Sequence, residues 1–419
     1  MHRILVYCFA ALFICQTAWG QKEIARNYID TLCSPYFFGR GYAKDGVNKA
    51  AEYLQNELKL KGIDPFFGYS YFQPFDHKAN VFTGNTKLSI GGKQLELGKD
   101  FIPNAMSGSF DGEIPIYPIS IPQKLEESFV KDLLATKPEG KFALAINKEE
   151  LDQSENGELY KMILSQGYPL LIYGYEKLTW GASTRSTTYP ILEIAAKKLK
   201  TKKPASIRVN NQLLDYRSKN VAGFIRGTKN PDRYVILSAH YDHLGGMDEN
   251  VFVPGANDNA SGTAMVLNLA GILKENPPEY SVIPMFFAGE ELGLLGSKFF
   301  TDKEVIPLNQ IAFVLNLDLL GTGDDGFTIV NGSIFEDYTK VLQSLNDSLE
   351  KPLPQIKLRG EAANSDHYWF SKKGVPAFFI YTLGGITAYH DIQDKAATLP
   401  LTRYDDMLIL LENFIRNIP

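Results

Sequence analysis

The fold is decided by the stretch Val235-Ile236-Leu237-Ser238-Ala239-His240, an apolar run of strand length that ends on a histidine. Three more apolar runs of this kind follow over 282–288, 312–317 and 377–381, with helical stretches between them. Buried strands that alternate with helices are typical of a mostly parallel sheet covered on both faces. The sequence therefore predicts an α/β fold with a mixed sheet. Pro284 in the second run favours a position away from the centre, because proline cannot donate to a β-ladder.

The rest of the chain divides into two parts. Residues 47–60 place apolar side chains at helical spacing, as expected for an amphipathic helix packed on a core. From about residue 80 to 217, short β-type runs separated by Gly, Asn and Pro replace this pattern. We therefore predict one domain made of 21–80 and 216–419, interrupted by a small β-rich inserted domain at 81–215.

Composition narrows the class of protein. Of the 419 residues, 44% are hydrophobic, 12% aromatic and 22% charged, which is the balance of a soluble globular chain and not of a disordered or collagen-like one. The 43 Lys and Arg against 48 Asp and Glu leave a net charge of −5, and neither sign forms a block. We therefore expect no nucleic-acid partner.

The first 20 residues predict a secretory signal peptide. Arg3 precedes an apolar run over 4–15, and Ala18-Trp19-Gly20 has small residues on both sides of a bulky one. The run is shorter than the roughly 20 residues that a membrane span needs, and no later stretch qualifies. We expect an exported protein, periplasmic or secreted, with no membrane span in the mature chain. Removal of residues 1–20 would take away two of the three cysteines and leave only Cys33, which excludes an internal disulfide and a thiolate zinc cluster in the mature chain.

Potential metal ligands follow each of the four predicted strands. His240 ends the first, Glu290 and Glu291 follow the second, Asp318 follows the third, and His390 lies in the loop after the fourth. Ligands of open α/β sheets bind just beyond the carboxyl ends of the strands. We therefore expect these side chains to converge at one edge of the sheet.

Asp258 belongs to the same edge, because the stretch 254–262 leads into a helix with regular apolar spacing. Alone it is equally well explained as a helix N-cap. Two histidines and three carboxylates together suit zinc, and a carboxylate can bridge two zinc ions. Glu290 and Glu291 cannot both ionise freely in a partly dry site unless a cation is close. We therefore predict that one of the pair is a ligand and the other a general base.

Six motifs in order resemble those of one family. They are Ser238-Ala239-His240-Tyr241-Asp242-His243, Gly255-Ala256-Asn257-Asp258-Asn259-Ala260-Ser261-Gly262, Gly289-Glu290-Glu291-Leu292-Gly293-Leu294-Leu295-Gly296-Ser297, Asn316-Leu317-Asp318, Ser365-Asp366-His367, and Tyr389-His390 followed by Asp394. The family is that of the zinc-dependent aminopeptidases related to bacterial secreted leucine-type aminopeptidases, glutamate carboxypeptidase and the non-catalytic transferrin receptor ectodomain. The resemblance covers most of the mature chain and implies the zinc exopeptidase fold.

The resemblance implies a site with two zinc ions per chain. Asp258 bridges the two ions, His240 and Asp318 complete one site, and Glu291 and His390 complete the other. Glu290 is then the base that takes a proton from the attacking water and passes it to the leaving amine. The implied reaction is hydrolysis of N-terminal residues from peptides with a free N-terminus.

The resemblance also implies supporting roles. Asp242 matches a position that orients His240, and ligating imidazoles do usually donate their second N–H to a partner. Tyr389 matches a position that steadies the tetrahedral intermediate. Three other motif residues are expected to have structural or hydrogen-bonding roles rather than to bind metal: His243, Asp366 and His367.

Two weaker resemblances concern the start of the catalytic domain and the interior of the inserted domain. Gly39-Arg40-Gly41 is similar to the start of the catalytic domain of the same family, which agrees with an interrupted domain. Inside the insertion, 140–144, 167–173 and 189–191 loosely resemble a protease-associated domain.

Three other functions stay open. A glutaminyl cyclase shares the fold and typically uses one zinc. A carboxypeptidase needs a basic residue for the terminal carboxylate of its substrate, and Arg359 is the obvious candidate. A non-catalytic binding ectodomain is the alternative of another class, but such relatives generally lose metal ligands, whereas this chain keeps all five and the base.

Overall fold

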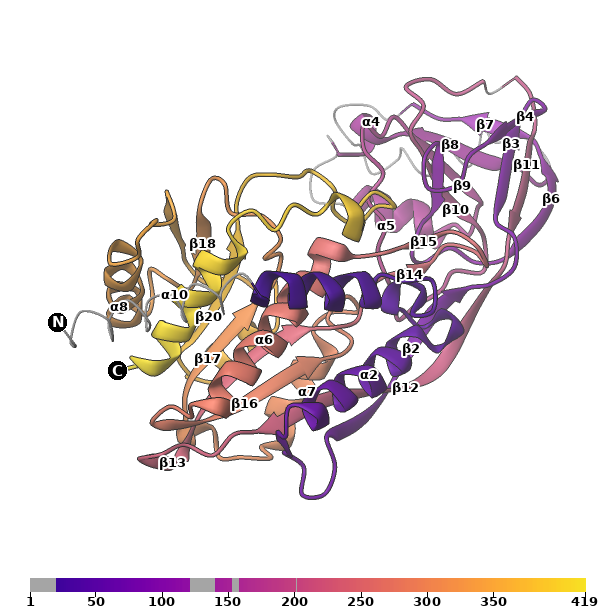
Figure 1. The fold of residues 1–419 in the computed structure, drawn as a ribbon. Helices are drawn as coiled ribbons and strands as arrows, with labels where there is room; N and C mark the ends of the chain where they lie inside the picture. Colours follow the sequence, from indigo (N-terminus) through magenta and orange to yellow (C-terminus); the bar gives the residue numbers. More distant parts are fainter. Residues whose placement is uncertain (1–19, 121–139, 153–157, 201) are drawn as a thin grey trace.

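The computed structural model describes residues 20–120, 140–152, 158–200 and 202–419, which form a larger and a smaller lobe (Figure 1). The predicted signal peptide, apart from Gly20, lies outside the described residues. Among the helices that are described, none is long and apolar enough to cross a membrane.

A nine-stranded mixed sheet forms the centre of the larger lobe, with the order β1-β12-β16-β13-β17-β20-β18-β19 and β2 paired with β12. The strands β16, β13, β17 and β20 run parallel, as predicted. The strands β12 and β18 pair antiparallel with β16 and β20. Their bounds are β1 Asp64–Pro65, β2 Phe72–Phe82, β12 Asn211–Phe224, β13 Asn230–His240, β16 Tyr280–Phe287, β17 Ile311–Leu317, β18 Phe327–Val330, β19 Ile356–Arg359 and β20 Ala377–Thr382.

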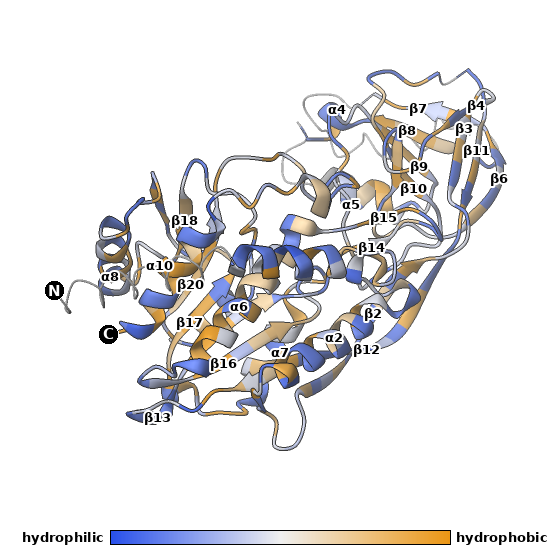
Figure 2. Cartoon of the chain, in the orientation of Figure 1, coloured by the Kyte–Doolittle hydropathy of each residue, from blue (hydrophilic) through white to orange (hydrophobic). Residues whose placement is uncertain are grey.

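The central strands are buried on both faces because nearly all of their side chains are apolar. All of β17 and the second half of β13 are buried. Along β13, Val235 and Leu237 pack into one apolar core and Ile236 into the core on the opposite face. Figure 2 shows the same contrast, with hydrophobic residues along central strands such as β17 and β20 and many hydrophilic residues in the surrounding helices.

Helices cover both faces of the sheet, which confirms the predicted fold class. A helix over 20–32 packs on one face together with α2, α6, α8 and α10. The other face carries α7 and α9 through Phe300 and Phe370. The helix bounds are α2 Gly46–Leu60, α6 Gly262–Glu275, α7 Leu295–Lys303, α8 Glu336–Asp347, α9 His367–Ser371 and α10 Tyr404–Arg416. Shorter helical turns are η1 Phe38–Arg40, η2 Ala43–Asp45, η4 Ala256–Ser261, η5 Leu308–Gln310 and η6 Ala396–Thr398.

The expectation drawn from Pro284 was wrong, because its strand β16 lies inside the sheet between β12 and β13. The pairing of β16 with β12 explains why proline is tolerated there. It joins Ile225 to Val282 and residues 221–222 to 285–286, and it skips the rung at Pro284. The N–H that proline lacks therefore falls in the gap of this ladder.

The smaller lobe lies between β2 and β12 in the sequence and contains two sheets, ordered β5-β10-β9-β8-β7 and β4-β3-β11-β6. Leu88, Leu171 and Ile207 belong to the apolar core that the two sheets share. The helix α5 packs on the other face of the five-stranded sheet. The bounds are β3 Lys87–Ile90, β4 Lys93–Leu95, β5 Phe101–Pro103, β6 Phe110–Ile114, β7 Ile116–Pro118, β8 Ala143–Asn147, α4 Lys148–Asp152, α5 Glu158–Ser165, β9 Leu170–Tyr173, β10 Ile191–Ile194 and β11 Ala205–Val209.

The strands β2 and β12 join the two lobes and pair with each other over residues 72–82 and 211–221 (Figure 1). The predicted domain boundaries at residues 80 and 216 fall inside these strands. The core of the smaller lobe also takes in residues of the larger lobe. A short ribbon of β14 (Gly245–Gly246) and β15 (Phe252–Val253) contributes Val253, Met247 follows β14, and Ile392 packs against this core. The smaller lobe is therefore packed against loops at the carboxyl ends of the central strands.

Candidate metal centre

The sequence-predicted ligands all lie where central strands end. His240 is the last residue of β13, and Asp318 directly follows β17. Glu291 lies between β16 and α7, and His390 lies in the loop after β20. Asp258 lies in the turn η4 that leads into α6. The structure thus brings together five residues that span 151 positions of the chain, from 240 to 390.

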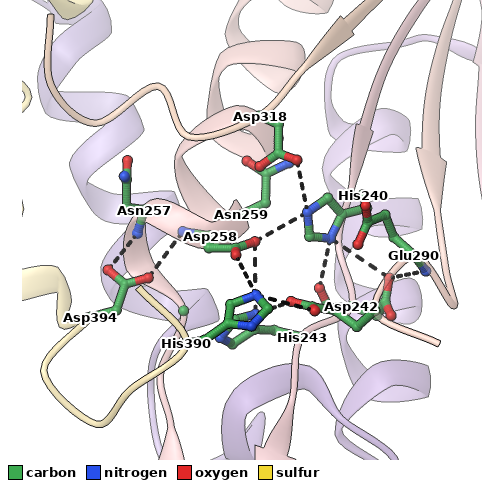
Figure 3. A network of polar contacts seen from close by, with 12 residues as sticks. His240, Asp242, His243, Asn257, Asp258, Asn259, Glu290, Asp318, His390 and Asp394 are labelled. Atoms are coloured by element: carbon green, nitrogen blue, oxygen red, sulfur yellow. Dashed lines mark hydrogen bonds and ion pairs between the residues drawn. The ribbon is translucent and has the colours of Figure 1, made fainter. Parts of the chain in front are cut away.

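Asp258 stands at the centre of this group and faces both histidines (Figure 3). Its Oδ1 lies 3.2 Å from Nε2 of His240, and its Oδ2 lies 3.0 Å from Nε2 of His390. The same nitrogen of His240 is 3.3 Å from Oδ2 of Asp318, and that of His390 is 3.3 Å from Oε2 of Glu291. The five side chains therefore form two groups that share one carboxylate.

A cavity of about 210 Å³ opens onto this cluster. The five predicted ligands line it together with Glu290, the predicted base. Its other lining residues are Leu319, Arg359, Asn364, Phe379, Tyr381 and Tyr389. The cavity is therefore acidic at its floor, and Arg359 is the only Lys or Arg among the lining residues.

The donor set fits zinc, because it consists of imidazole nitrogens and carboxylate oxygens that converge within the site. Two sets of side chains could each hold a metal ion, because the ligand atoms within each set lie within 4.8 Å of one another. One set is His240, Glu290 and Asp318, and the other is His243, Asp258 and Glu291. Among the residues that the structure describes, the buried Oδ1 of Asp318 finds no hydrogen-bond partner, which is unfavourable unless a cation or water meets it.

His243 contacts two of the predicted ligands, Glu291 and Asp258, which the sequence did not indicate. Its Nδ1 lies 2.7 Å from Oε1 of Glu291, and it lies 3.9 Å from Oδ1 of Asp258. The ring is fully buried. A hydrogen bond of this kind fixes the carboxylate that it touches, so His243 orients Glu291. The signal in the sequence was its position three residues after His240.

Asp242 orients His240 in a different way from the one expected. Its backbone carbonyl lies 3.0 Å from Nδ1 of His240, whereas its carboxylate oxygen lies 3.8 Å away. The carboxylate instead accepts hydrogen bonds from the backbone N–H of Glu290 and the hydroxyl of Tyr42. Asp242 therefore supports both the predicted ligand and the predicted base.

The turn that carries Asp258 is held by Asp394. The two oxygens of the Asp394 carboxylate accept the backbone N–H groups of Asn257 at 2.8 Å and of Asp258 at 3.0 Å. Asn259 adds a bond from its amide to the carbonyl of Leu317 at the end of β17. These bonds place the Asp258 carboxylate between the two histidines (Figure 3).

Charge in the cluster is balanced between carboxylates and imidazoles. Burial alone lowers the pKa of His390, but Glu291 and Asp258 raise it to about 11. Burial raises the pKa of Asp258, yet hydrogen bonds from His240 and His390 outweigh this effect and hold it well below its usual range. In the same way, His390 and His243 outweigh the effects of burial and Asp258 and bring the pKa of Glu291 to about 2.

Glu290 differs from its neighbour Glu291. Burial raises the pKa of Glu290 well above its usual range, and the carboxylates of Glu291, Asp366 and Asp318 raise it further. The pKa values of the two adjacent glutamates are therefore shifted in opposite directions.

Tyr389, Asp366 and His367 take different positions. Tyr389 is 44% exposed at the rim of the cavity, and its ring stacks on that of His390 with centroids 4.0 Å apart. Asp366 and His367 are fully buried, and neither lines the cavity. Ser365 beside them hydrogen-bonds Asp318 at 3.2 Å, so this motif supports a predicted ligand from behind.

The sequence of the larger lobe matches a known family. Residues 220–415 match the model described as Peptidase family M28. Aminopeptidase YwaD of Bacillus subtilis is 27% identical over 304 residues, which are 68% of this chain and 62% of that protein. A probable zinc metalloprotease of Leptosphaeria maculans is 38% identical over 114 residues, or 26% of either protein. The chain thus covers less than two thirds of the length of these curated relatives.

Solved structures share the fold over nearly the whole chain. BSAP, a zinc aminopeptidase from Bacillus subtilis, superposes with a TM-score of 0.68 at 20% identity, covering 94% of this chain and 93% of that one. An aminopeptidase from Aneurinibacillus sp. strain AM-1 gives a TM-score of 0.65 at 19% identity, covering 94% and 93%. The inserted lobe is therefore included in the shared fold.

Proposed function

We propose that the chain, whose residues 220–415 match the model of peptidase family M28, is an aminopeptidase that holds two zinc ions. It removes N-terminal residues from peptides with a free N-terminus. The observation that carries the proposal is the position of Asp258, whose two oxygens lie 3.2 and 3.0 Å from the imidazoles of His240 and His390.

The five predicted ligands divide between the two ions. His240, Asp258 and Asp318, which contact one another, would hold one ion, and Asp258 with Glu291 and His390 would hold the second. When bound, zinc supplies Lewis-acid chemistry that polarises a carbonyl group and makes water a stronger nucleophile at neutral pH.

Glu290 moves the proton in this proposal. It lines the cavity beside the ligands, and Asp242 holds its backbone N–H at 3.2 Å. Its carboxylate accepts a proton from the attacking water and then donates that proton to the amine that leaves. Tyr389 lies at the rim of the same cavity and donates its hydroxyl to the carbonyl oxygen as negative charge develops there.

The first test combines metal analysis with activity. The purified chain is expected to contain about two zinc ions and to release the chromophore from aminoacyl chromogenic amides. Chelation should abolish this release, and zinc should restore it. Matched amides with a blocked N-terminus should not react. A chain that binds zinc but cleaves only peptides with blocked N-termini would contradict the proposal.

Two substitutions separate the roles of base and ligand. Glu290→Gln removes the proton acceptor and leaves the five ligands in place, so it should retain zinc and lose about 10²- to 10⁴-fold in kcat. Asp258→Asn should lose zinc as well as activity, because Asp258 serves both ions. Zinc content and kcat measured on both variants check this, and a Glu290→Gln enzyme of nearly normal rate would remove Glu290 from the mechanism.

One observation favours a second candidate, a carboxypeptidase. Arg359 at the end of β19 lines the cavity, donates to the hydroxyl of Tyr381 at 3.1 Å and has no ion-pair partner among the described residues. A guanidinium in this position could bind the terminal carboxylate of a peptide. Release of C-terminal residues from N-blocked peptides, lost in Arg359→Met, would favour this candidate. Cyclisation of an N-terminal glutamine with one zinc would favour a cyclase, and a folded chain without zinc would favour a binding ectodomain.

A further inference from the structure

The predicted ligand His390 is held by the inserted lobe. Its Nδ1 lies 3.0 Å from the backbone carbonyl of Trp180, and the backbone N–H of Trp180 donates to the carbonyl of His390 at 2.8 Å. The two residues are 210 positions apart and belong to different lobes. This pair of hydrogen bonds is reciprocal, so it fixes both the ring and the backbone of His390.

The contact also determines which ring nitrogen carries a proton. A carbonyl oxygen can only accept a hydrogen bond, so Nδ1 of His390 must be the donor. In the neutral ring, Nε2 then has its lone pair free and aimed at Asp258 and Glu291, which lie 3.0 and 3.3 Å away. The carbonyl of Trp180 therefore sets the tautomer that a metal ligand needs.

His240 donates the equivalent bond within its own lobe. Its Nδ1 is 3.0 Å from the carbonyl of Asp242, two residues further along the same loop. The two proposed zinc sites thus differ in what orients their histidine. One histidine depends on its own loop, and the other depends on the inserted lobe.

Trp180 is firmly anchored in that lobe. Its side chain is only 4% exposed and belongs to the core between the two small sheets. The indole N–H donates to the carbonyl of Pro103 at 2.8 Å, and the ring lies 5.8 Å from that of Phe82. A backbone carbonyl attached to so well-packed a residue is a rigid acceptor.

A second contact lies beside the first. Lys177 donates to the backbone carbonyl of Thr387 at 2.7 Å and forms an ion pair of 3.0 Å with Asp391. The side chain of Asp391 is only 14% exposed, so this pair is better shielded from water than most surface pairs. We call the contacts between residues 177–180 and residues 387–391 the clasp.

The backbone at His390 needs such support. Its φ is +53°, in the left-handed region that non-glycine residues seldom adopt. A conformation of this kind is unfavourable for a residue with a Cβ atom and persists where surrounding contacts impose it. The clasp supplies contacts of that kind on both sides of the residue.

We propose that the clasp positions His390, so that the inserted lobe controls the affinity of one of the two zinc sites. The inference rests on the proposed zinc centre. Loosening the clasp weakens zinc binding by His390 and Glu291 and leaves the site of His240 and Asp318 unchanged. The inserted lobe is then a working part of the metal centre and more than a spacer.

The test is zinc titration of the metal-free full chain against a competing chelator dye, which gives two dissociation constants. Lys177→Met removes the ion pair at a half-exposed position and should raise one of the two dissociation constants about three- to tenfold. Asp391→Lys, which places two lysines together, should raise the same dissociation constant further. Lys177→Asp combined with Asp391→Lys should bring that constant part of the way back to its original value. The matched control is Lys78→Met, which breaks a 2.8 Å ion pair with Asp215 away from the site.

Removing one site at a time identifies the affected constant. In a His390→Ala background, which leaves the His240 site, Lys177→Met should have no effect. In a His240→Ala background it should weaken the remaining site. An equal rise of both dissociation constants, or no change relative to Lys78→Met, would overturn the role of the clasp but not the proposed zinc centre. Failure of the unmodified chain to bind two zinc ions would instead overturn the proposed centre itself.

Discussion

Arg40 shows how one buried charge organises the loops that surround the candidate metal centre. Its guanidinium is fully buried and donates to the carbonyls of Tyr241, Pro254 and Gly255 at 2.9, 2.7 and 2.7 Å. The first of these carbonyls lies in the loop after β13, and the others directly precede the turn of Asp258. A single planar side chain with several donors therefore ties together the two segments that carry His240 and Asp258.

We predict that Arg40→Lys lowers the free energy of unfolding by about 3 kcal/mol or more. Lysine keeps the charge but cannot match the fork of donors, so buried carbonyls are left without partners. Denaturant titration measures the change. Arg217→Lys is the matched control, because its 3.6 Å ion pair with Asp76 is exposed and should contribute about 0.5 kcal/mol or less. Equal effects of the two substitutions would show that the buried network contributes little.

His367 makes stability depend on pH. Burial lowers its pKa to about 4 from an ordinary value of 6.5. Between these values the unfolded chain binds a proton that the folded chain excludes, so stability is lost as the pH falls from 6.5 towards 4. Each step of one pH unit below 6.5 removes about 1.4 kcal/mol of stability, so the loss at pH 4.5 is about 2 to 3 kcal/mol.

His367→Gln cannot take up this proton. We therefore predict that the free energy of unfolding of His367→Gln falls less between pH 7 and pH 4.5 than that of the unmodified chain, by about 2 to 3 kcal/mol. Denaturant titrations at the two pH values, with both proteins in parallel, measure the difference. Other titrating groups are common to both proteins and cancel. Identical losses would mean that His367 is charged in the folded chain.

At the scale of elements, the turn η1 and the ribbon strand β14 pack backbone against backbone. A Cβ atom at Gly41 would lie 2.5 Å from Cα and 2.6 Å from the nitrogen of Gly245. The backbone angles of Gly41, φ −92° and ψ −164°, are ordinary for alanine. The glycine is therefore required by close approach of two chain segments and not by its own conformation. This approach lets Arg40 reach the loops described above.

We predict that Gly41→Ala destabilises the fold by about 3 kcal/mol, because backbone atoms cannot move aside for the methyl group. Thermal or chemical unfolding measures the change. Gly360→Ala is the matched control, since the nearest atom to its added Cβ is the Ser333 hydroxyl oxygen at 3.7 Å, an ordinary contact. Equal stability of Gly41→Ala and Gly360→Ala would contradict the prediction. It would mean that η1 and β14 can move apart at little cost in free energy.

At the scale of the whole molecule, the edge of the large sheet and the inserted lobe meet at the acidic cluster. Asp258, Glu291 and Asp318 lie together in the site, and histidines supply the balancing charge. Loops from both halves of the larger lobe meet at this cluster, and the clasp connects the smaller lobe to one of these loops. A cation at this point would therefore bind groups from several loops of the larger lobe and would favour the folded state.

We predict that chelation lowers the stability of the whole chain in one cooperative transition. A ligand that binds only the folded state at 100 times its dissociation constant adds about 2.7 kcal/mol for each site. Calorimetric scans with zinc and with a chelator measure the effect, and zinc added after chelation should reverse it. Magnesium at the same concentration is the control, because the imidazole ligands suit zinc better. An unchanged melting temperature would count against a structural contribution from metal.

The sequence alone determined the α/β architecture, because it depends on local patterns. Apolar runs over 235–239 and 312–317 had to be buried strands, and parallel strands bring their carboxyl ends to one edge. His240 and Asp318 were therefore predictable neighbours. Pro284 was misjudged because the register of β12 against β16, which leaves a gap at that rung, depends on two strands that are distant in sequence.

The tertiary structure decided which groups support the site. The bond of His390 to Trp180 spans 210 residues, and that of Arg40 to Tyr241 spans 201. Such contacts produce no recognisable pattern in the sequence of either segment, because they depend on single side chains and on backbone carbonyls that every residue has. They form only when two lobes or two loops are packed together. The sequence therefore named the candidate ligands, and the packing of the chain selected what holds each of them in place.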